Sequence, residues 1–291
     1  MIASQDQIRV TAETAHRDYV LTDYEPVVSP VGRLQPVSLF RHALRGAGWL
    51  EAVWPICEVL RQAVGPDRTV WALKFGADGL GVEFYLYNNQ ANDPVGPLSI
   101  APVADALAPL GAFPQRCEER IPYFMWSFEV TIQGLLAGRF SPIRLYLDTG
   151  ETLREPGGFS YRLEGGAAIL ENHYSFYKPD TELEDARRRL ARSPRSGRPS
   201  AWRGLMPVWL CDCHTICYAV KPRRDGLYFA RLQTAPLARF LRRVHKRELS
   251  AVLDAHAHDF AHCVWDLGFD FAMPEDATRP AIQKMAIHGV L

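Results

Sequence analysis

Charged and tyrosine side chains alternate with bulky apolar ones along several segments of the sequence. Glu83, Tyr85 and Tyr87 occupy every second position of one segment, and Arg144 and Tyr146 do so in another. Side chains two apart on a β-strand point to the same face, so each segment would have a polar face and an apolar face. A strand face with cations, carboxylates and phenols suits the wall of a wet ligand chamber. These residues are the first candidates for a functional site.

A second group contains residue types that bind metal ions. Three thiols and an imidazole lie close together at Cys211, Cys213, His214 and Cys217, and a second set comprises His256, His258, His262 and Cys263. Zinc prefers such ligands, but Cys-x-Cys on a strand is awkward for a tetrahedral ion, and no His-Glu-x-x-His motif is present. The pattern favours free core cysteines and surface histidines, with a zinc site as a weaker alternative.

The elements that would position the polar faces are mostly hairpins. Segments rich in β-branched and aromatic residues occur in pairs joined by Gly-containing turns. The expected strand pairs are residues 69–75 with 82–87, 123–132 with 142–147, 159–163 with 168–177, and 214–220 with 227–233; a last strand covers 282–290. Consecutive hairpins favour an antiparallel sheet.

Helical spacing of apolar residues predicts helices between the hairpins. They cover residues 39–60, broken or kinked near Gly46, Gly48 and Pro55, and then 103–110, 181–190, 236–244 and 248–265. Residues 1–36 form an irregular N-terminal segment in this interpretation. A helix-covered apolar face and a polar opposite face fit a closed barrel, although an open α+β sheet shares the pattern. We predict a single α+β domain over residues 1–291, an antiparallel β-barrel surrounded by α-helices.

Composition argues against several classes of partner. The chain has 291 residues, a formal net charge of zero and 47% hydrophobic residues, which speaks against nucleic acid. No apolar run approaches the roughly 18 residues of a membrane span, and the N-terminus does not read as a secretory signal. The six cysteines have no disulfide-like spacing. We therefore expect a cytoplasmic protein with free thiols and no membrane partner.

The order and spacing of the hairpins resemble those of the ABBA-type prenyltransferases, in particular the enzymes that modify cyanobactin peptides. The similarity covers most of the chain and rests on degenerate stretches: residues 69–87 (TVWALKFGADGLGVEFYLY), 126–131 (WSFEVT), 141–148 (SPIRLYLD), 215–221 (TICYAVK), 226–232 (GLYFARL) and 282–291 (IQKMAIHGVL). The resemblance implies a ten-stranded barrel, the ABBA or PT barrel, with an active site in its lumen. It also implies transfer of a dimethylallyl or geranyl group from an allylic diphosphate to a peptide (Tyr, Trp or Arg type) or a small molecule, in the biosynthesis of a natural product.

In such a reaction cations bind the leaving diphosphate, aromatic faces shield the allylic cation, and a carboxylate orients the acceptor or takes its proton. The expected diphosphate ligands are Lys74, Arg144, Tyr146, Arg162, Lys221, Arg231 and Lys284, and the expected shielding residues are Tyr85, Tyr87, Tyr177 and Phe229. Glu129 is the preferred acid, followed by Glu83 and Glu171. The resemblance requires no cofactor; a magnesium ion can accompany a diphosphate, but no Asp-Asp-x-x-Asp motif is present.

Two features depart from the family pattern. Only about ten residues, 149–158, separate the second and third hairpins, where the family usually has a helix. The glutamate expected in the first strand would fall near Val70 or Trp71, so any acid that acts on the acceptor must come from another strand. A non-catalytic barrel that binds a small molecule or peptide is therefore the main alternative, ahead of a zinc-binding protein.

Overall fold

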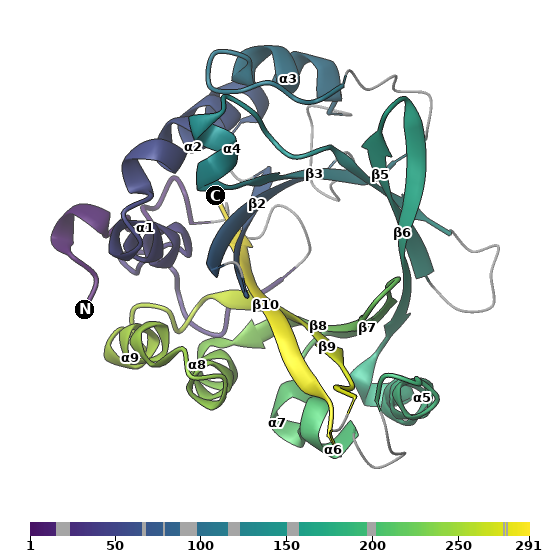
Figure 1. The fold of residues 1–291 in the computed structure, drawn as a ribbon. Coiled ribbons are helices and arrows are strands. Elements are labelled where there is room, and N and C mark those ends of the chain that lie inside the picture. The colour runs from purple at the N-terminus through teal and green to yellow at the C-terminus, as the bar shows by residue number, and fades with distance from the viewer. Residues whose placement is uncertain are drawn as a thin grey trace.

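The strands close into a barrel, which Figure 1 shows along its axis with helices around the outside. The structure is a computed structural model that describes residues 1–15, 24–65, 68–77, 79–87, 98–115, 123–149, 157–196, 202–275, 277 and 279–291. Ten antiparallel strands follow the order β1-β10-β9-β8-β7-β6-β5-β4-β3-β2 around the barrel. The predicted α+β barrel of the ABBA or PT type is thus confirmed.

Each strand pairs with its neighbours in sequence, and β1 closes the barrel against β10. The strands are β1 Thr69–Gly76, β2 Gly79–Tyr87, β3 Met125–Val130, β4 Arg144–Asp148, β5 Gly157–Glu164, β6 Ala167–Tyr177, β7 Thr215–Val220, β8 Asp225–Gln233, β9 Val264–Ala272 and β10 Ala281–Val290. In the closing pair, Val70 lies opposite Val290 and Lys74 opposite Ala286. Closure leaves no open sheet edge.

The helices pack on the outer face of the barrel. They are η1 Ser4–Asp6, α1 Val37–Gly46, α2 Leu50–Val64, α3 Ile100–Leu107, α4 Ile132–Leu136, α5 Pro179–Ala191, α6 Trp202–Leu205, α7 Val208–Cys211, α8 Thr234–Arg243 and α9 Arg247–Ala255. The predicted break near Gly46 and Gly48 separates α1 from α2, and Gly48 adopts a φ of 72°, a conformation that favours glycine. Helix α2 continues through Pro55, so the helix is not broken there.

Part of one expected helix is a strand. We predicted a helix over residues 248–265, but α9 ends at Ala255 and β9 begins at Val264. Along β9 the aromatic and aliphatic residues Trp265, Leu267, Phe269 and Phe271 occupy every second position and are buried. This is the period of a strand and not of a helix. The prediction extended the helical spacing of α9 past its end, and it missed the strand that joins β8 to β10.

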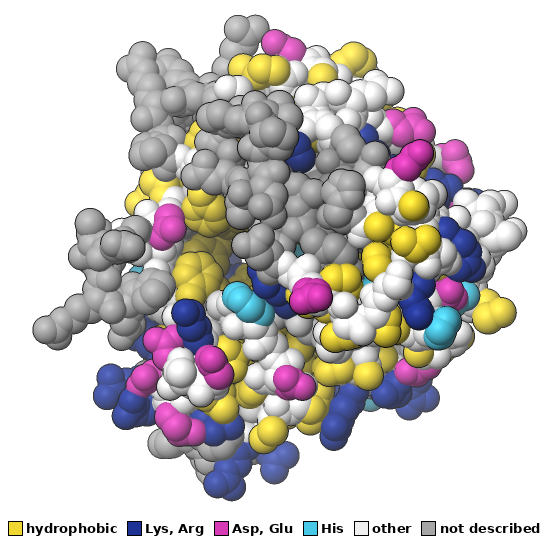
Figure 2. Space-filling model, turned by 180° about the vertical axis from the view of Figure 1, so that it is seen from behind, with side chains coloured by type: hydrophobic (Ala, Val, Ile, Leu, Met, Phe, Trp, Pro, Cys, Tyr) yellow, Lys and Arg dark blue, Asp and Glu magenta, His cyan; other side chains and the backbone are white. Residues whose placement is uncertain are grey.

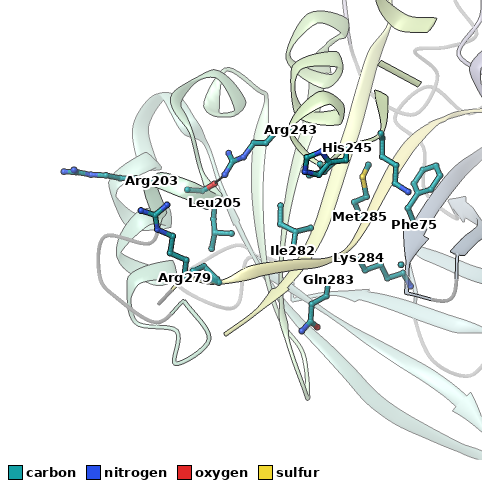
Figure 3. Close-up of a pocket in the computed structure, with 15 residues that line it drawn as sticks. Phe75, Arg203, Leu205, Arg243, His245, Arg279, Ile282, Gln283, Lys284 and Met285 are labelled. Carbon is teal, nitrogen blue, oxygen red and sulfur yellow. Dashed lines mark hydrogen bonds between the residues drawn. The ribbon is translucent and has the colours of Figure 1, made fainter. Parts of the chain in front are cut away.

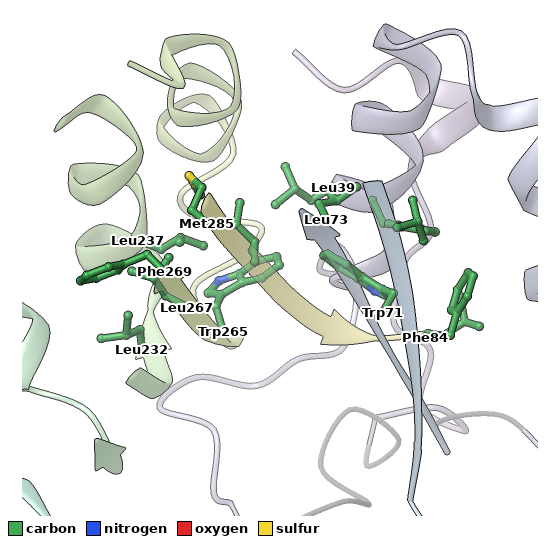
Figure 4. Packing of buried hydrophobic residues seen from close by; sticks show 14 of the residues in the cluster. Leu39, Trp71, Leu73, Phe84, Leu232, Leu237, Trp265, Leu267, Phe269 and Met285 are labelled. Carbon is green, nitrogen blue, oxygen red and sulfur yellow. The ribbon is translucent and has the colours of Figure 1, made fainter. Parts of the chain in front are cut away.

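The hydrophobic core lies between the outer barrel face and the helices. Trp71 of β1 and Trp265 of β9 are fully buried and meet edge to face, with ring centroids 6.4 Å apart (Figure 4). The indole N–H of Trp265 donates to Thr234 Oγ1 at 3.0 Å, which satisfies its polar atom. Phe269 stacks on Phe240 of α8. Because the apolar faces point outward into this core, the polar faces of the same strands point into the lumen.

Charge is unevenly distributed over the surface although the formal net charge is zero. Figure 2 shows the face behind the view of Figure 1, where Lys and Arg side chains gather along the lower edge. A hollow with hydrophobic walls lies nearer the centre of the same face. The molecule therefore has local regions that suit anionic and apolar ligands.

Removing the Trp265 side chain tests the role of β9 in the core. We expect Trp265→Ala to lower the free energy of unfolding by about 3–5 kcal/mol, since a large buried side chain leaves a cavity. Urea unfolding of the wild type and the variant measures this difference. Leu136→Ala is the control, because Leu136 is 85% exposed and its loss should change stability by less than about 0.5 kcal/mol. Equal losses in the two variants would contradict the placement of β9.

Candidate active site

Two cavities occupy the barrel lumen. The charged chamber has a volume of about 480 Å³, and its lining includes Lys74, Glu83, Glu129, Arg144, Lys221, Asp270 and Lys284. The aromatic chamber has a volume of about 240 Å³, and its lining includes Val70, Tyr87, Phe159, Phe176 and Asp266. Five residues line both chambers, and we call them the collar: Tyr85, Tyr146, Tyr174, Tyr228 and His288.

The Glu83 carboxylate is the most connected group of the charged chamber, and the residue is 2% exposed. Its Oε2 accepts hydrogen bonds from Lys74 Nζ at 2.6 Å and Tyr85 OH at 2.8 Å. Its Oε1 accepts from Ser127 Oγ at 2.6 Å and Arg144 Nη1 at 3.4 Å. Burial alone would raise the pKa of Glu83, but Lys74 and Arg144 together hold it well below its usual range. This ionised carboxylate links side chains of β1, β2, β3 and β4.

Arg144 connects Glu83 to charged residues of β5 and β6. Its Nε donates to Glu171 Oε2 at 2.8 Å, and Glu171 Oε1 accepts from Arg162 Nε at 2.9 Å. Arg162 also forms an ion pair with Glu164. Glu171 of β6 thus accepts from Arg162 of the adjacent strand β5 and from Arg144 of β4, two strands away. Arg144 and Glu171 line the charged chamber, whereas Arg162, predicted as a diphosphate ligand, lines neither chamber and joins the network through Glu171.

Glu129 joins the network from β3. It forms an ion pair with Lys74, and its Oε1 lies 3.5 Å from Lys284 Nζ. Burial lowers the pKa of Lys74 to about 7, against the opposing effect of Glu83, and it also lowers the pKa of Lys284. Nearby like charges act in the same direction as burial. A polyanion in this chamber would therefore stabilise the charged forms of both lysines.

A second buried acid, Asp270 of β9, lies in the charged chamber. It accepts from Lys221 Nζ at 2.6 Å and pairs with Arg224 Nε at 3.1 Å. Lys221 also donates to the Tyr228 hydroxyl at 2.8 Å. The structure thus places Lys221 in the site as predicted. Asp270 and Arg224 were missed; the alternation of acids with aromatic residues along β9 was the signal for Asp270.

The four tyrosines of the collar come from β2, β4, β6 and β8. The ring centroids are 6.1 Å apart for Tyr85 and Tyr146, 6.2 Å for Tyr146 and Tyr174, and 6.5 Å for Tyr174 and Tyr228. Side chains of alternate strands form layers in this way inside barrels. Burial raises the pKa of all four phenols, which are therefore neutral. Gly268 makes room for this layer, because a Cβ there would overlap the Tyr228 ring.

Besides Arg162, three predicted site residues lie outside both chambers. Tyr177 and Phe229 are buried in the outer core, so the prediction that they shield a cation in the lumen is wrong. Their immediate strand neighbours Phe176 and Tyr228 point inward instead. Arg231 lines neither chamber, which contradicts its predicted role as a diphosphate ligand. A bulge in β8 precedes Leu232, and Arg231 adopts a φ of 58° there, with its backbone N–H donating to Asp266 Oδ1 at 2.8 Å.

The cysteines and histidines do not assemble a metal site in the part of the chain that the structure describes. Cys57, Cys211, Cys213, Cys217 and Cys263 are free thiols. Burial raises the pKa of Cys213 to about 12, which favours the thiol over the thiolate that zinc requires. Within the described ranges, no helix has both the length and the apolar character needed to cross a membrane.

A larger cavity lies outside the lumen, next to α6, the end of α8 and β10 (Figure 3). We call it the basic cleft; its volume is about 980 Å³, and its basic residues are Arg203, Arg243, His245, Lys246, Arg279 and Lys284. None of the described residues that line it is acidic. Gln283, Lys284 and Met285 line both the basic cleft and the charged chamber. The two cavities are therefore neighbours that share Lys284.

No protein-family model matches the chain, and no curated protein shows significant similarity to it.

Replacing Glu83 tests its role as the central carboxylate. The pKa of Glu83 lies below its ordinary value of 4.5, so its ionisation stabilises the folded state above that pH, and this stabilisation is lost as pH falls through the folded pKa. We expect Glu83→Gln to lower the free energy of unfolding by about 3 kcal/mol or more at pH 7, since it removes a buried carboxylate that pairs with both Lys74 and Arg144. The difference should shrink below pH 4.5. Urea unfolding across this range measures both effects.

Glu164→Gln is the matched control for this experiment. The Glu164 side chain is 54% exposed, so its loss should change stability by less than about 1 kcal/mol. A Glu83→Gln variant that is as stable as the control at pH 7 would show that Glu83 does not hold the network together.

Proposed function

We propose that the protein is a prenyltransferase that moves a dimethylallyl or geranyl group from an allylic diphosphate to a peptide side chain or a small molecule. The observation that supports this most strongly is the order of environments along the lumen. A chamber rich in cations leads through a layer of four tyrosines to an aromatic chamber. An allylic diphosphate has the same order of parts: an anionic head, a reactive carbon and an apolar chain.

The diphosphate would lie among Lys74, Arg144 and Lys221 in the charged chamber. The bond between the first allylic carbon and the diphosphate oxygen breaks with its electron pair remaining on oxygen, so negative charge develops at the diphosphate. Preorganised cations stabilise that charge. Glu83, Glu129 and Asp270 already accept from or pair with these cations, which leaves no ready set of oxygen ligands for magnesium. We therefore propose a diphosphate site built from cations, without a metal cofactor.

The collar would surround the reactive carbon. Ring faces stabilise a nearby cation through their quadrupoles, and neutral phenols do this without capturing the cation as phenolates would. The rings also exclude water, which would otherwise consume the allylic cation. Tyr146, expected from the sequence as a diphosphate ligand, belongs to this layer. We propose that it serves both the phosphate end and the cation.

The acceptor would enter the aromatic chamber. Its described lining contains several aromatic rings and a single carboxylate, Asp266, which favours a tyrosine or tryptophan side chain over an arginine. Glu83, Glu129 and Glu171 were expected to orient the acceptor, but all three form ion pairs in the network around the charged chamber. In this proposal they position the cations. The free thiols fit a reducing compartment, and we propose the cytoplasm.

A barrel that binds a ligand without reaction is the second candidate. It is favoured by the ion pairing within the charged chamber, which already satisfies Glu83 without a ligand. Incubation with dimethylallyl or geranyl diphosphate and cyclic peptides that contain Tyr, Trp or Arg, followed by mass spectrometry, separates the two. Added isoprene mass supports the enzyme, and thermal stabilisation by a thio-diphosphate analogue without added mass supports the binding barrel. If the protein shows neither added mass nor thermal stabilisation, both candidate functions are contradicted.

Substitution of single cations tests the diphosphate site. We expect Arg144→Ala and Lys221→Ala each to weaken binding of dimethylallyl thio-diphosphate by about tenfold or more, because each removes a charged hydrogen bond to the ligand. Isothermal titration calorimetry measures the affinity. Arg139→Ala is the control, since Arg139 is exposed and lines neither chamber. Unchanged affinity in both chamber variants would refute this site.

The basic cleft gives a prediction for the kinetics of donor binding. Its cations adjoin the charged chamber through Lys284 and would attract an approaching diphosphate. We expect the double variant Arg243→Ala/Arg279→Ala to lower the association rate constant at low salt, with little change in the dissociation rate constant. Stopped-flow binding at two ionic strengths measures this. The control double variant Arg139→Ala/Lys178→Ala removes the same charge outside the cleft, and an equal effect there would show that only net charge matters.

A further inference from the structure

His288 of β10 has an imidazole whose tautomer is set by its surroundings. Its Nδ1 lies 3.0 Å from the backbone carbonyl oxygen of Asp266, and the register of β10 on β9 places these two residues opposite each other. A carbonyl oxygen only accepts hydrogen bonds, so Nδ1 carries the proton. In the neutral ring Nε2 then has a free lone pair. The fold thus presents a nitrogen base in the lumen.

The position of His288 in the collar suits a base for the proposed reaction. It is the only collar residue that is not a tyrosine, and it lines both chambers. Its ring contacts the Tyr85 ring, with centroids 5.5 Å apart. It therefore lies at the same level of the barrel as the tyrosines that would surround the allylic carbon. An acceptor atom that reaches this carbon from the aromatic chamber passes beside His288.

The groups around His288 leave its ring neutral near pH 7. Burial lowers its pKa, while Asp266 of β9 and Glu83 of β2 act in the opposite direction and Lys74 of β1 acts with burial. Tyr85 of β2 is the phenol in ring contact with it. A neutral imidazole can take a proton, whereas an imidazolium cannot.

The carboxylates are less suited to this role. Four of them are ion-paired with cations of the charged chamber: Glu83, Glu129, Glu171 and Asp270. Asp266 is the only acid among the described residues that line the aromatic chamber, and its Oδ1 already accepts the backbone N–H of Arg231. The Nδ1–H of His288 is used by the backbone, but its Nε2 remains available to a ligand.

We propose that His288 is the catalytic base that takes the proton of a phenol or indole acceptor; this inference rests on the proposed prenyl transfer. The bond between the allylic carbon and the diphosphate oxygen breaks, and its electron pair stays on the diphosphate. The acceptor oxygen or ring carbon then forms a bond to the allylic carbon. The proton that this atom loses moves to Nε2 of His288, and the imidazolium returns it to solvent after the product leaves.

Substitution of His288 tests this role in the reaction itself. Glutamine keeps an N–H that can donate to the Asp266 carbonyl but offers no basic nitrogen. We expect His288→Gln to lower the single-turnover rate constant, measured with bound donor and saturating acceptor, by about 100-fold or more. Affinity for the thio-diphosphate analogue should change by less than about threefold, since the diphosphate cations are intact. His258→Gln is the control, because His258 is exposed and lines neither lumen chamber nor the basic cleft.

Two further measurements separate a base from a structural residue. Added imidazole should restore part of the lost rate in His288→Ala, where it can occupy the vacated space, and should not do so in His288→Gln. A nitrotyrosine peptide bound together with the thio-diphosphate analogue should show more phenolate absorbance in the wild type than in His288→Gln, because Nε2 accepts the phenol proton. The second measurement needs no transfer reaction.

These outcomes distinguish this inference from the proposed function. Equal rate constants in the wild type and His288→Gln would overturn the inference and leave proton transfer to another acceptor, such as the departing diphosphate. Equal phenolate absorbance would overturn it as well. A wild type that binds both ligands and transfers no prenyl group would contradict the proposed function instead, and the absorbance difference would then decide the role of His288 by itself.

Discussion

The buried carboxylate of Glu83 is the interaction on which the lumen depends. Closing the barrel turns every second side chain inward, so the charges on those positions must find partners away from bulk water. Glu83 provides such a partner to Lys74 and Arg144, and it accepts from Ser127 and Tyr85 as well. Without it, Lys74 would keep only Glu129 and Arg144 would keep Glu171 and a longer contact to Glu129, with no buried carboxylate between the two cations. With it, both cations are held in place before any ligand arrives, which is the condition for electrostatic stabilisation of a leaving group.

Position along each strand sets the depth of a residue in the lumen. Glu83, Tyr85 and Tyr87 occupy inward positions of β2: Glu83 lines the charged chamber, Tyr85 belongs to the collar, and Tyr87 lines the aromatic chamber. On β10 the corresponding positions begin with Lys284 and end with His288. Adjacent strands run in opposite directions, so the order from charged to aromatic residues along the sequence reverses from one strand to the next. The gradient from charge to aromatic rings is therefore a property of the whole barrel and not of a single hairpin.

The sequence predicts which side chains face the lumen where the alternation is regular. On β2 and β4 the period of two places Glu83 and Arg144 in the lumen, as the structure shows. The prediction fails where the period changes. β9 follows closely after a helix, and the bulge in β8 ends the regular alternation just before Leu232. The prediction that Tyr177 lies in the lumen fails for a simpler reason, because Tyr177 is one residue out of step with the inward positions of β6. Aromatic character near a strand end does not by itself place a side chain in the lumen.

The ion-pair partners of a charged residue were harder to predict than the strand face on which the residue lies. Lys221 and Asp270 are far apart in the sequence and meet because β7, β8 and β9 are adjacent in the barrel. Such contacts depend on strand order and stagger, which a pattern of single residues does not contain. The role of His288 was missed for the same reason, since its tautomer depends on the carbonyl of the neighbouring strand. Residue types and their faces can thus be predicted from the sequence, whereas the network that tunes them comes from the closed fold.

A crystal structure with a bound geranyl thio-diphosphate analogue would test the proposed donor site. We expect phosphate oxygens within hydrogen-bonding distance of Lys74, Arg144 and Lys221, with the first prenyl carbon among the tyrosines of the collar. An analogue bound only in the basic cleft, or with its apolar chain in the charged chamber, would refute this site.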